Sequence, residues 1–171
     1  LREAMVREHV AARGVRSEAV LAAMRKVPRE DYVPAAQRAF AYDDRAQSIA
    51  EGQTISQPYI VGYMLDVAEV RRGDRVLEVG TGSGYCAAVI AEIAAEVHSV
   101  ERIRALADAA RARLLEAGYD QVSVHVADGT LGLRDEAPFD AIIVTAGGPD
   151  VPGTLLRQLA PNGRLVMPIG D

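Results

Sequence analysis

Apolar residues recur along the chain with two different spacings, and the spacing changes near residue 73. In the first part they recur every three or four positions, as on one face of an amphipathic helix. This spacing predicts helices over residues 1–13, 17–27 and 60–70. Gly14 is expected to end the first helix and Ser17 to cap the second, while the segment between Pro28 and Pro58 breaks into turns. We therefore expect the amino-terminal part to be helices joined by an irregular segment.

After residue 73, short apolar runs alternate with helical patterns. The expected strands are Arg75–Val79, Val97–Val100, Val122–Val126, Asp140–Thr145 and Arg164–Pro168. The expected helices are Tyr85–Ala95, Ile103–Ala117 and Val151–Leu159, with a Pro161-Asn162-Gly163 turn before the last strand. Strands that alternate with helices predict an α/β fold, a mostly parallel sheet with helices on both faces. Because ligands of such sheets bind beyond the carboxyl ends of the strands, functional residues are expected at 80–84, 101, 128–129 and 145–149.

Composition and charge narrow the classes of protein. The 171 residues, 49% of them hydrophobic and 25% charged, suit one domain with a substantial core and exclude a disordered chain. A formal net charge of −5 argues against general nucleic-acid binding, which uses a basic surface. No apolar run approaches the roughly 18 residues of a transmembrane helix, no secretory leader is visible, and the single cysteine excludes an internal disulfide. We expect a cytoplasmic protein with no membrane or nucleic-acid partner, and a monomer rather than an oligomer.

A glycine-rich loop joins the strand that ends at Val79 to the next helix, and its sequence is Glu78-Val79-Gly80-Thr81-Gly82-Ser83-Gly84. Glycines allow positive φ and a close approach of the backbone to a ligand. The spacing is G-x-G-x-G rather than the G-x-G-x-x-G of dinucleotide-binding loops, and Glu78 would repel a pyrophosphate. An acidic group here favours a ligand with an amino group and a sulfonium, so the loop suits S-adenosylmethionine better than NAD. A tight strand-to-helix turn without a ligand is the alternative.

Two further acidic residues follow the next two strands. Glu101 lies 21 residues after Gly80, where a carboxylate accepts hydrogen bonds from a ribose diol. Asp128 could accept a hydrogen bond from an adenine amino group, and Gly129 beside it leaves room for the ring. Taken singly, Glu101 is explained as a solvated charge or a helix-dipole partner, and Asp128 as an ordinary Asp-Gly turn. Together with the glycine loop, they predict one cofactor site at three successive strand ends.

Six segments of the chain match the motifs of one family. They are GQTISQP (Gly52–Pro58), VLEVGTGSGY (Val76–Tyr85), VERI (Val100–Ile103), DG (Asp128–Gly129), PFD (Pro138–Asp140) and QL (Gln158–Leu159). With these segments the chain resembles the protein-L-isoaspartate O-methyltransferases over nearly its whole length. The glycine loop is common to many methyltransferases, whereas the Thr54-Ile55-Ser56 segment is much more specific to this family.

The resemblance implies a Rossmann-like class I fold that binds S-adenosylmethionine and releases S-adenosylhomocysteine. It implies methyl transfer to the free α-carboxylate of L-isoaspartyl residues in damaged proteins or peptides, which initiates their repair through a succinimide. The expected cofactor-binding residues are Glu78, Gly80, Thr81, Gly82, Ser83, Gly84, Glu101, Asp128 and Gly129. The implied substrate loop contains Gln53, Thr54, Ile55 and Ser56, with Ser56 as the catalytic residue beside the transferring methyl.

This chemistry requires positioning more than proton transfer. An α-carboxylate has a pKa of about 3.5 and is ionised at neutral pH, so no general base is needed. The protein must supply in-line alignment and exclude water. The neutral hydroxyl of Ser56 can orient one carboxylate oxygen without lowering its nucleophilicity, whereas a tightly paired arginine would lower it. Without the resemblance, Ser56 is explained as a turn residue before Gln57-Pro58.

The resemblance also implies a single methyltransferase domain over residues 1–171. Residues 1–58 would form its helical amino-terminal part and substrate loop, and residues 59–171 its cofactor-binding core. Members of the family continue beyond the equivalent of Asp171 with a segment that completes the sheet edge and contacts the site. A carboxyl-terminal segment is therefore expected to be missing from this chain.

Other reactive side chains are given structural roles. Cys86 is expected to fill space at the start of a helix. His9, His98 and His125 are scattered without metal-ligand spacing, so no metal site is predicted. The segment Gly147-Gly148-Pro149 suits either a mobile rim of the site or a plain loop.

Alternative functions stay open at this point. The same fold and cofactor would serve a carboxyl methyltransferase for a dedicated peptide or a small molecule. An inactive cofactor-binding module would also carry the glycine loop. A dehydrogenase is disfavoured by the loop spacing and by Glu78.

Overall fold

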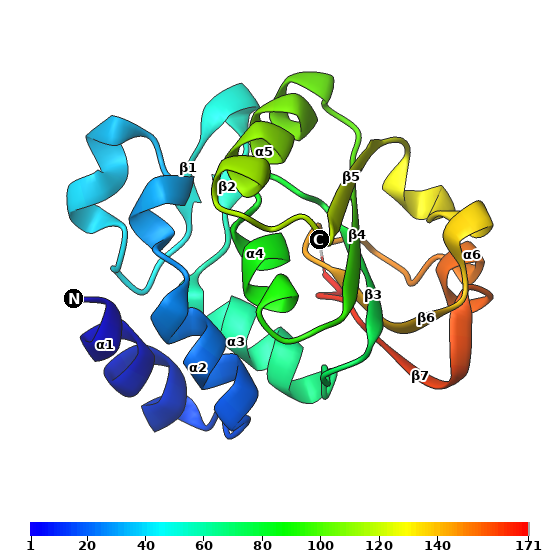
Figure 1. Cartoon of the computed structure of the whole chain (residues 1–171), viewed down its shortest axis with the longest axis horizontal. Coiled ribbons are helices and arrows are strands. Elements are labelled where there is room, and N and C mark those ends of the chain that lie inside the picture. Colours follow the sequence, from blue (N-terminus) through cyan, green and yellow to red (C-terminus); the bar gives the residue numbers. More distant parts are fainter. Residues whose placement is uncertain (171) are drawn as a thin grey trace.

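A five-stranded, all-parallel sheet forms the centre of the structure, a computed structural model that describes residues 1–170 (Figure 1). Its strands are β3 (Arg75–Val79), β4 (Glu96–Glu101), β5 (Val122–Val126), β6 (Phe139–Val144) and β7 (Leu159–Val166). Their order in the sheet is β5-β4-β3-β6-β7. The chain leaves β3 toward β4 and β5 and then returns to the other side of β3, so the switch point lies between β3 and β6.

Helices and a small hairpin complete the fold. The α-helices are α1 (Arg2–Ala4), α2 (Glu18–Lys26), α3 (Pro58–Val67), α4 (Tyr85–Ala91), α5 (Arg104–Glu116) and α6 (Gly153–Leu156). Short 3-10 helices cover Ala11–Arg13, Arg29–Tyr32, Ala35–Phe40, Ala50–Gly52, Gly129–Leu131 and Arg134–Glu136. The hairpin pairs β1 (Gln47–Ser48) with β2 (Thr54–Ile55) in antiparallel fashion. The expected α/β fold with a parallel sheet is confirmed.

Alternate residues of the central strands point to opposite faces of the sheet, and each face has its own hydrophobic cluster. Val76 and Ile143 belong to the larger cluster, which includes residues of α2, α3 and α4. Leu77 and Ile142 belong to the smaller cluster, which includes Leu155 of α6. The central strands of the sheet are thus buried on both faces, as a parallel sheet requires.

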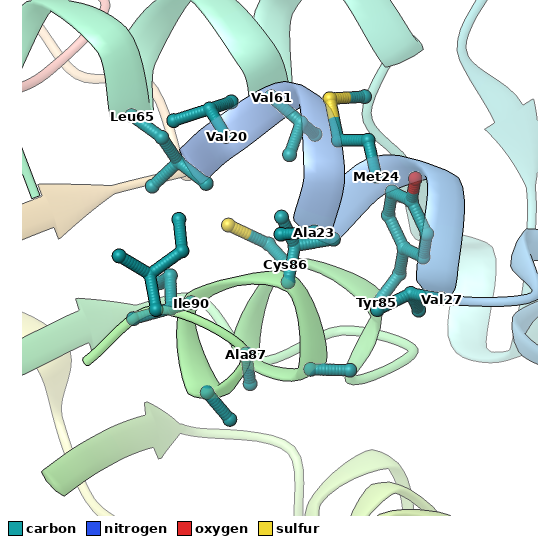
Figure 2. Close-up of a cluster of buried hydrophobic side chains, with 14 of the residues drawn as sticks. Val20, Ala23, Met24, Val27, Val61, Leu65, Tyr85, Cys86, Ala87 and Ile90 are labelled. Atoms are coloured by element: carbon teal, nitrogen blue, oxygen red, sulfur yellow. The ribbon is translucent and has the colours of Figure 1, made fainter. Parts of the chain in front are cut away.

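The amino-terminal helices share the larger cluster with the sheet. Figure 2 shows α2 and α3 packing against α4, with apolar side chains of all three helices interlocked. The labelled residues are Val20, Ala23, Met24, Val27, Val61, Leu65, Tyr85, Cys86, Ala87 and Ile90. Gly62 of α3 allows the segment before α2 to approach closely, because a Cβ on Gly62 would lie 2.7 Å from Cγ1 of Val10. One continuous core therefore joins the amino-terminal part to the α4 layer.

The first helix differs from the prediction. Residues 1–13 form α1, a π-helix over Met5–Val10 and a 3-10 turn, instead of one α-helix. The wider π turn places Met5, Val6 and Val10 in the core. Gly14 ends the segment in the left-handed conformation with φ of 105°, as expected.

Two other helices have different bounds from those predicted. The helix expected over 60–70 begins at Pro58, a residue suited to the first helical position, and ends at Val67. The helix expected over 85–95 ends at Ala91. The amides of Ile93 and Ala94 both donate to the carbonyl of Ile90, which closes a tight turn before β4.

The carboxyl-terminal prediction of a helix, a turn and a strand is also wrong in detail. The helix is only α6, because the chain returns to the sheet at Leu159, opposite Phe139. The turn expected at 161–163 lies inside β7 as a bulge, since Phe139 pairs with Leu159 but Ala141 pairs with Arg164. Asn162 has a φ of 62° in this bulge.

Among residues 1–170, no helix is both long enough and apolar enough to cross a lipid bilayer.

Candidate cofactor and substrate site

A cavity of about 320 Å³ opens at the carboxyl ends of the strands, which is large enough for a small-molecule ligand. Five segments contribute to its wall: the hairpin with Ser56, the glycine loop with the start of α4, the end of β4, the end of β6, and α3. Its lining residues are Gln53, Thr54, Ile55, Ser56, Val61, Glu78, Gly80, Thr81, Gly82, Ser83, Tyr85, Cys86, Glu101, Thr145, Ala146 and Gly147. The cavity therefore joins most of the predicted cofactor residues to the whole predicted substrate loop.

The glycine loop has a backbone that other residues would not adopt. Gly80 and Gly82 have φ of 102° and 51°. A Cβ on Gly80 would lie 2.6 Å from Oγ1 of Thr145, whose hydroxyl donates to the carbonyl of Gly80 at 2.7 Å. Thr145 thus fixes the loop from the end of β6. The sequence pattern identified the loop but not this partner.

Glu78 lies on the floor of the cavity and is fully buried. Its Oε2 accepts a hydrogen bond from Ser99 at 2.5 Å, while its Oε1 has no hydrogen-bond partner in the described residues. Burial, opposed by the bond from Ser99, raises the pKa of Glu78 to about 7. Cys86 lies beside this carboxylate, and burial raises the pKa of its thiol. The unpartnered Oε1 of Glu78 suits the ammonium group of a ligand. The thiol of Cys86 stays un-ionised and only fills space.

Glu101 forms another wall and is nearly buried. One oxygen accepts from the amide of Gly82 and the other from the amide of Ile103, both at 3.0 Å. These bonds hold the glycine loop against the end of β4. Because each carboxylate oxygen can accept a second hydrogen bond, Glu101 keeps the capacity to bind a diol.

Three predicted cofactor residues are not part of the cavity wall. Gly84 is the left-handed N-cap of α4, with φ of 89°. Asp128 is exposed and accepts hydrogen bonds from the amide and hydroxyl of Thr130, which lower its pKa. Gly129 packs on the end of β3, where a Cβ would lie 2.4 Å from Cγ1 of Val79. The carboxylate of Asp128 thus bonds within its own loop. Its expected contact with adenine stays a prediction.

The predicted substrate loop is the connection and second strand of the hairpin. The amide of Ile49 donates to the carbonyl of Gln53 at 2.8 Å, and β1 pairs with β2 beyond it. The loop after β2 is anchored by two partly buried hydrogen bonds: Arg29 donates to the carbonyl of Ser56, and the side-chain amide of Gln57 donates to the carbonyl of Asp44. The hairpin thus lies over the glycine loop and places Ser56 at the cavity.

Several cavity residues were not singled out as site residues in the sequence. Val61 of α3 and Tyr85 of α4 enter the wall because both helices begin beside the loops. Thr145 and Ala146 were expected only as part of a loop after a strand. Arg29 has no sequence signal that distinguishes it from surface arginines, although it is fully buried.

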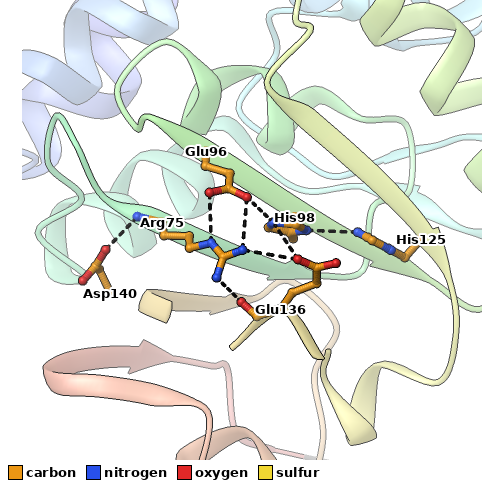
Figure 3. Close-up of polar contacts among 6 residues, drawn as sticks. All are labelled: Arg75, Glu96, His98, His125, Glu136 and Asp140. Atoms are coloured by element: carbon orange, nitrogen blue, oxygen red, sulfur yellow. Dashed lines mark hydrogen bonds and ion pairs between the residues drawn. The ribbon is translucent and has the colours of Figure 1, made fainter. Parts of the chain in front are cut away.

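From the sequence, the three histidines are interpreted as scattered, and the structure corrects this for two of them. His98 and His125 are not scattered, because Nδ1 of His98 lies 3.0 Å from Nε2 of His125 on the neighbouring strand (Figure 3). His98 also contacts Glu96 at 2.7 Å and lies 3.8 Å from Glu136. These three residues have metal-ligand chemistry, with ligand atoms within 4.8 Å of one another.

An arginine already pairs with both carboxylates of this cluster. Arg75 donates to Glu96 at 2.9 Å and to Glu136 at 3.2 Å (Figure 3). Arg75 and Glu96 are the first residues of β3 and β4, so the cluster lies at the opposite end of the sheet from the cavity. We interpret it as a structural ion-pair network across the amino ends of the strands.

Comparison with known proteins agrees with the motifs. The family profile described as protein-L-isoaspartate(D-aspartate) O-methyltransferase matches residues 1–171. A protein-L-isoaspartate O-methyltransferase 2 of Pelobacter propionicus is 56% identical over 99% of this chain and 75% of its own length. A protein-L-isoaspartate O-methyltransferase of Methanoculleus marisnigri is 55% identical over 99% of this chain and 77% of its own length.

Solved structures agree as well. A protein-L-isoaspartate O-methyltransferase superposes with a TM-score of 0.89 at 30% identity, over 99% of this chain, and this chain spans 55% of that one. A Plasmodium falciparum protein described as a β-aspartate methyltransferase, in complex with S-adenosyl-L-homocysteine, has a TM-score of 0.84 at 25% identity over 99% of this chain and 84% of its own. The resemblance seen in the motifs is confirmed, and the chain belongs to the protein-L-isoaspartate(D-aspartate) O-methyltransferase family.

Proposed function

We propose that this chain transfers a methyl group from S-adenosylmethionine to the free α-carboxylate of L-isoaspartyl residues in damaged proteins or peptides. The observation that carries the proposal is the cavity in which the Thr54-Ile55-Ser56 segment faces the glycine loop. In a member of this family, the glycine loop would bind the methyl donor and the Thr54-Ile55-Ser56 segment would bind the acceptor at the same cavity. The ester would then collapse to a succinimide, which initiates repair.

The residues of the cavity fit S-adenosylmethionine. The unpartnered Oε1 of Glu78 suits an ammonium group, and the spare acceptor capacity of Glu101 suits a ribose diol. The positive φ of Gly80 and Gly82 lets a ligand lie directly against the backbone. When bound, the cofactor supplies an activated methyl group on its sulfonium.

Ser56 is proposed to align the acceptor. The isoaspartyl α-carboxylate is ionised at neutral pH, so the site needs no group that removes a proton. A hydroxyl donor at the cavity wall can hold one carboxylate oxygen while the other points at the methyl. The hairpin that lies over the glycine loop would exclude water, which competes as a nucleophile.

The test is a radiolabelled methyl-transfer assay with three samples: an isoaspartyl peptide, its aspartyl twin and no peptide. We expect label only on the isoaspartyl peptide. Equal labelling of both peptides would indicate a carboxyl methyltransferase with another acceptor. Binding of S-adenosylhomocysteine without transfer to any carboxylate would indicate an inactive cofactor-binding module.

The cytoplasmic location and the monomeric state stay predictions. Light scattering of the purified chain with and without S-adenosylhomocysteine tests the second. A mass near 18.3 kDa is expected for a monomer.

A further inference from the structure

Arg29 is a fully buried arginine that ties two loops to the site. It lies at the start of the 3-10 helix that follows α2. Its Nε donates to the carbonyl of Ala41 and its Nη2 to the carbonyl of Ser56, both at 2.8 Å. These are the only hydrogen bonds of its guanidinium among residues 1–170, and both go to neutral backbone groups.

The charge of Arg29 has no acidic partner close by. Within the described chain, no carboxylate oxygen lies within 4.0 Å of its nitrogens, and its Nη1 is buried without a hydrogen-bond partner. Asp44, a more distant carboxylate, is already paired with Arg13 at 2.6 Å. Burial lowers the pKa of Arg29, but a guanidinium keeps its proton at neutral pH. A buried cation without a counter-ion is costly, so it calls for a functional explanation.

Two neighbours of this cation, Ser56 and Tyr85, line the cavity. Ser56 receives one of its hydrogen bonds, and the guanidinium carbon lies 4.8 Å from the centroid of the Tyr85 ring. The positive charge is therefore placed directly behind the wall where Ser56 and Tyr85 meet the cavity. In this low-dielectric surrounding, the charge acts over longer distances than it would in water.

We propose that Arg29 is a positioning and specificity-determining residue, which fixes the backbone of Ser56 and selects an ionised carboxylate as the methyl acceptor through its unpaired charge. This inference rests on the proposed function. The attraction acts through the wall, without a direct ion pair. An acceptor oxygen is thus drawn into the site and keeps the nucleophilicity that a tightly bound guanidinium would remove.

The test compares the binding of two peptides to the full chain saturated with S-adenosylhomocysteine. One peptide carries an isoaspartyl residue, and the other carries the same residue with its α-carboxylate converted to a carboxamide. Calorimetry gives the ratio of their dissociation constants. Arg29→Gln removes the charge and keeps a donor only at the position of Nε, which bonds to Ala41, so we expect the preference for the carboxylate to fall about tenfold. Arg29→Lys keeps the charge but cannot hold the carbonyls of Ala41 and Ser56 together. Its preference for the carboxylate peptide should persist at neutral pH, while kcat falls.

Arg25→Gln is the matched control, because it removes the same charge from a partly exposed arginine on α2 that pairs with Glu3 at the surface. It should leave both the ratio and kcat unchanged. Unchanged affinity for S-adenosylhomocysteine and an unchanged melting temperature show that each variant is folded. If the ratio of dissociation constants in Arg29→Gln equals that of the unmodified chain, the charge does not select the acceptor. Arg29 would then only hold the backbone in place.

A second measurement serves if Arg29→Gln does not fold. A buried lysine titrates at a lower pH than an arginine. The carboxylate preference of Arg29→Lys should therefore weaken between pH 7 and 9, while that of the unmodified chain stays constant. A preference with the same pH dependence in both proteins would contradict the proposal. Failure of the proposed function itself is distinguishable, because the unmodified chain would then methylate no isoaspartyl peptide.

Discussion

At the residue scale, Ser56 is where the proposed chemistry is most directly testable. Ser56→Ala removes one hydrogen-bond donor to the acceptor carboxylate but keeps the backbone carbonyl that Arg29 holds. We expect kcat and kcat/KM to fall together by roughly 10²-fold, as for loss of one preorganised donor. The affinity for S-adenosylhomocysteine should stay nearly unchanged. Full turnover in the variant would show that the hydroxyl only forms the turn.

Glu101 tests the cofactor assignment. Glu101→Ala should weaken binding of S-adenosylhomocysteine by about 1.5–3 kcal/mol, because it removes charged hydrogen bonds to the ribose and releases the Gly82 amide. Calorimetry measures the change. Asp128→Ala is the comparison, since Asp128 bonds only to Thr130 in its own loop. A loss as large as that of Glu101→Ala would place Asp128 at the cofactor, and an unchanged constant for Glu101→Ala would contradict its assignment.

Glu78 makes stability depend on pH. Its folded-state pKa of about 7 lies above the ordinary value of 4.5, so the folded chain holds this proton more tightly than the unfolded chain does. The stabilising contribution is fully present below pH 4.5 and is lost as pH rises through about 7. Denaturant unfolding of Glu78→Gln should therefore show a smaller decline between these pH values than the unmodified chain. Parallel pH profiles would mean that Glu78 does not titrate in this range.

The positive φ values of Gly80 and Gly82 agree with the prediction, while the ligand roles of these residues and of Glu78 stay predictions. The spacing of Gly80, Gly82 and Glu78 could be interpreted without neighbours, because positive φ and a charge beside a strand end are local properties. Arg29 and Thr145 could not be predicted in this way. Their roles arise from contacts with Ser56 and Gly80, which lie 27 and 65 residues away along the chain.

At the element scale, the hairpin is the part of the site expected to respond to ligand. Glu51 and Gly52 at its tip have φ of 57° and 65°, and no heavy atom lies within 4 Å of a Cβ built on Gly52. Its far end is held by Arg29. We expect hydrogen exchange of the Gln53–Gln57 amides to slow when S-adenosylhomocysteine binds, because the hairpin would close over the cofactor. Identical exchange with and without ligand would identify a static wall.

Strands were predicted better than helix ends at this scale. Arg75–Val79 and Val122–Val126 have the predicted bounds, because short segments rich in β-branched residues are a local signal for a strand. The helix expected over 85–95 ends at Ala91, where a turn set by Ile90 directs the chain into β4. The bulge in β7 depends on how β6 and β7 pair, which the local turn sequence does not specify.

At the scale of the whole molecule, the strand register brings distant residues together. His98 and Arg75 appear unrelated in the sequence, but β3 and β4 pair Arg75 with Glu96, two residues before His98. The same pairing of parallel strands places the glycine loop beside Glu101 at the other end. One arrangement of strands thus forms both the structural ion-pair network and the candidate site.

The shared core predicts that the amino-terminal part and the sheet unfold as one unit. The larger cluster includes residues from Met5 to Ile143, and a Cβ built on Gly62 would press against Val10 and Met24 within it. Gly62→Ala gains helix propensity, but its methyl would lie 2.7 Å from Cγ1 of the buried Val10. Overpacking should outweigh the propensity gain and lower the free energy of unfolding by about 1–2 kcal/mol.

Urea unfolding followed by circular dichroism and by tyrosine fluorescence measures this change. Both signals should show one coincident transition that shifts as a whole in Gly62→Ala, because the clash is transmitted through a single core. Val10→Ala is the matched partner. It opens the space that the new methyl needs, so the double variant should be more stable than the sum of the two single changes predicts. Two separate transitions, with only one of them moved by Gly62→Ala, would show that residues 1–58 and 59–171 are independent units, contrary to the single domain predicted from the sequence.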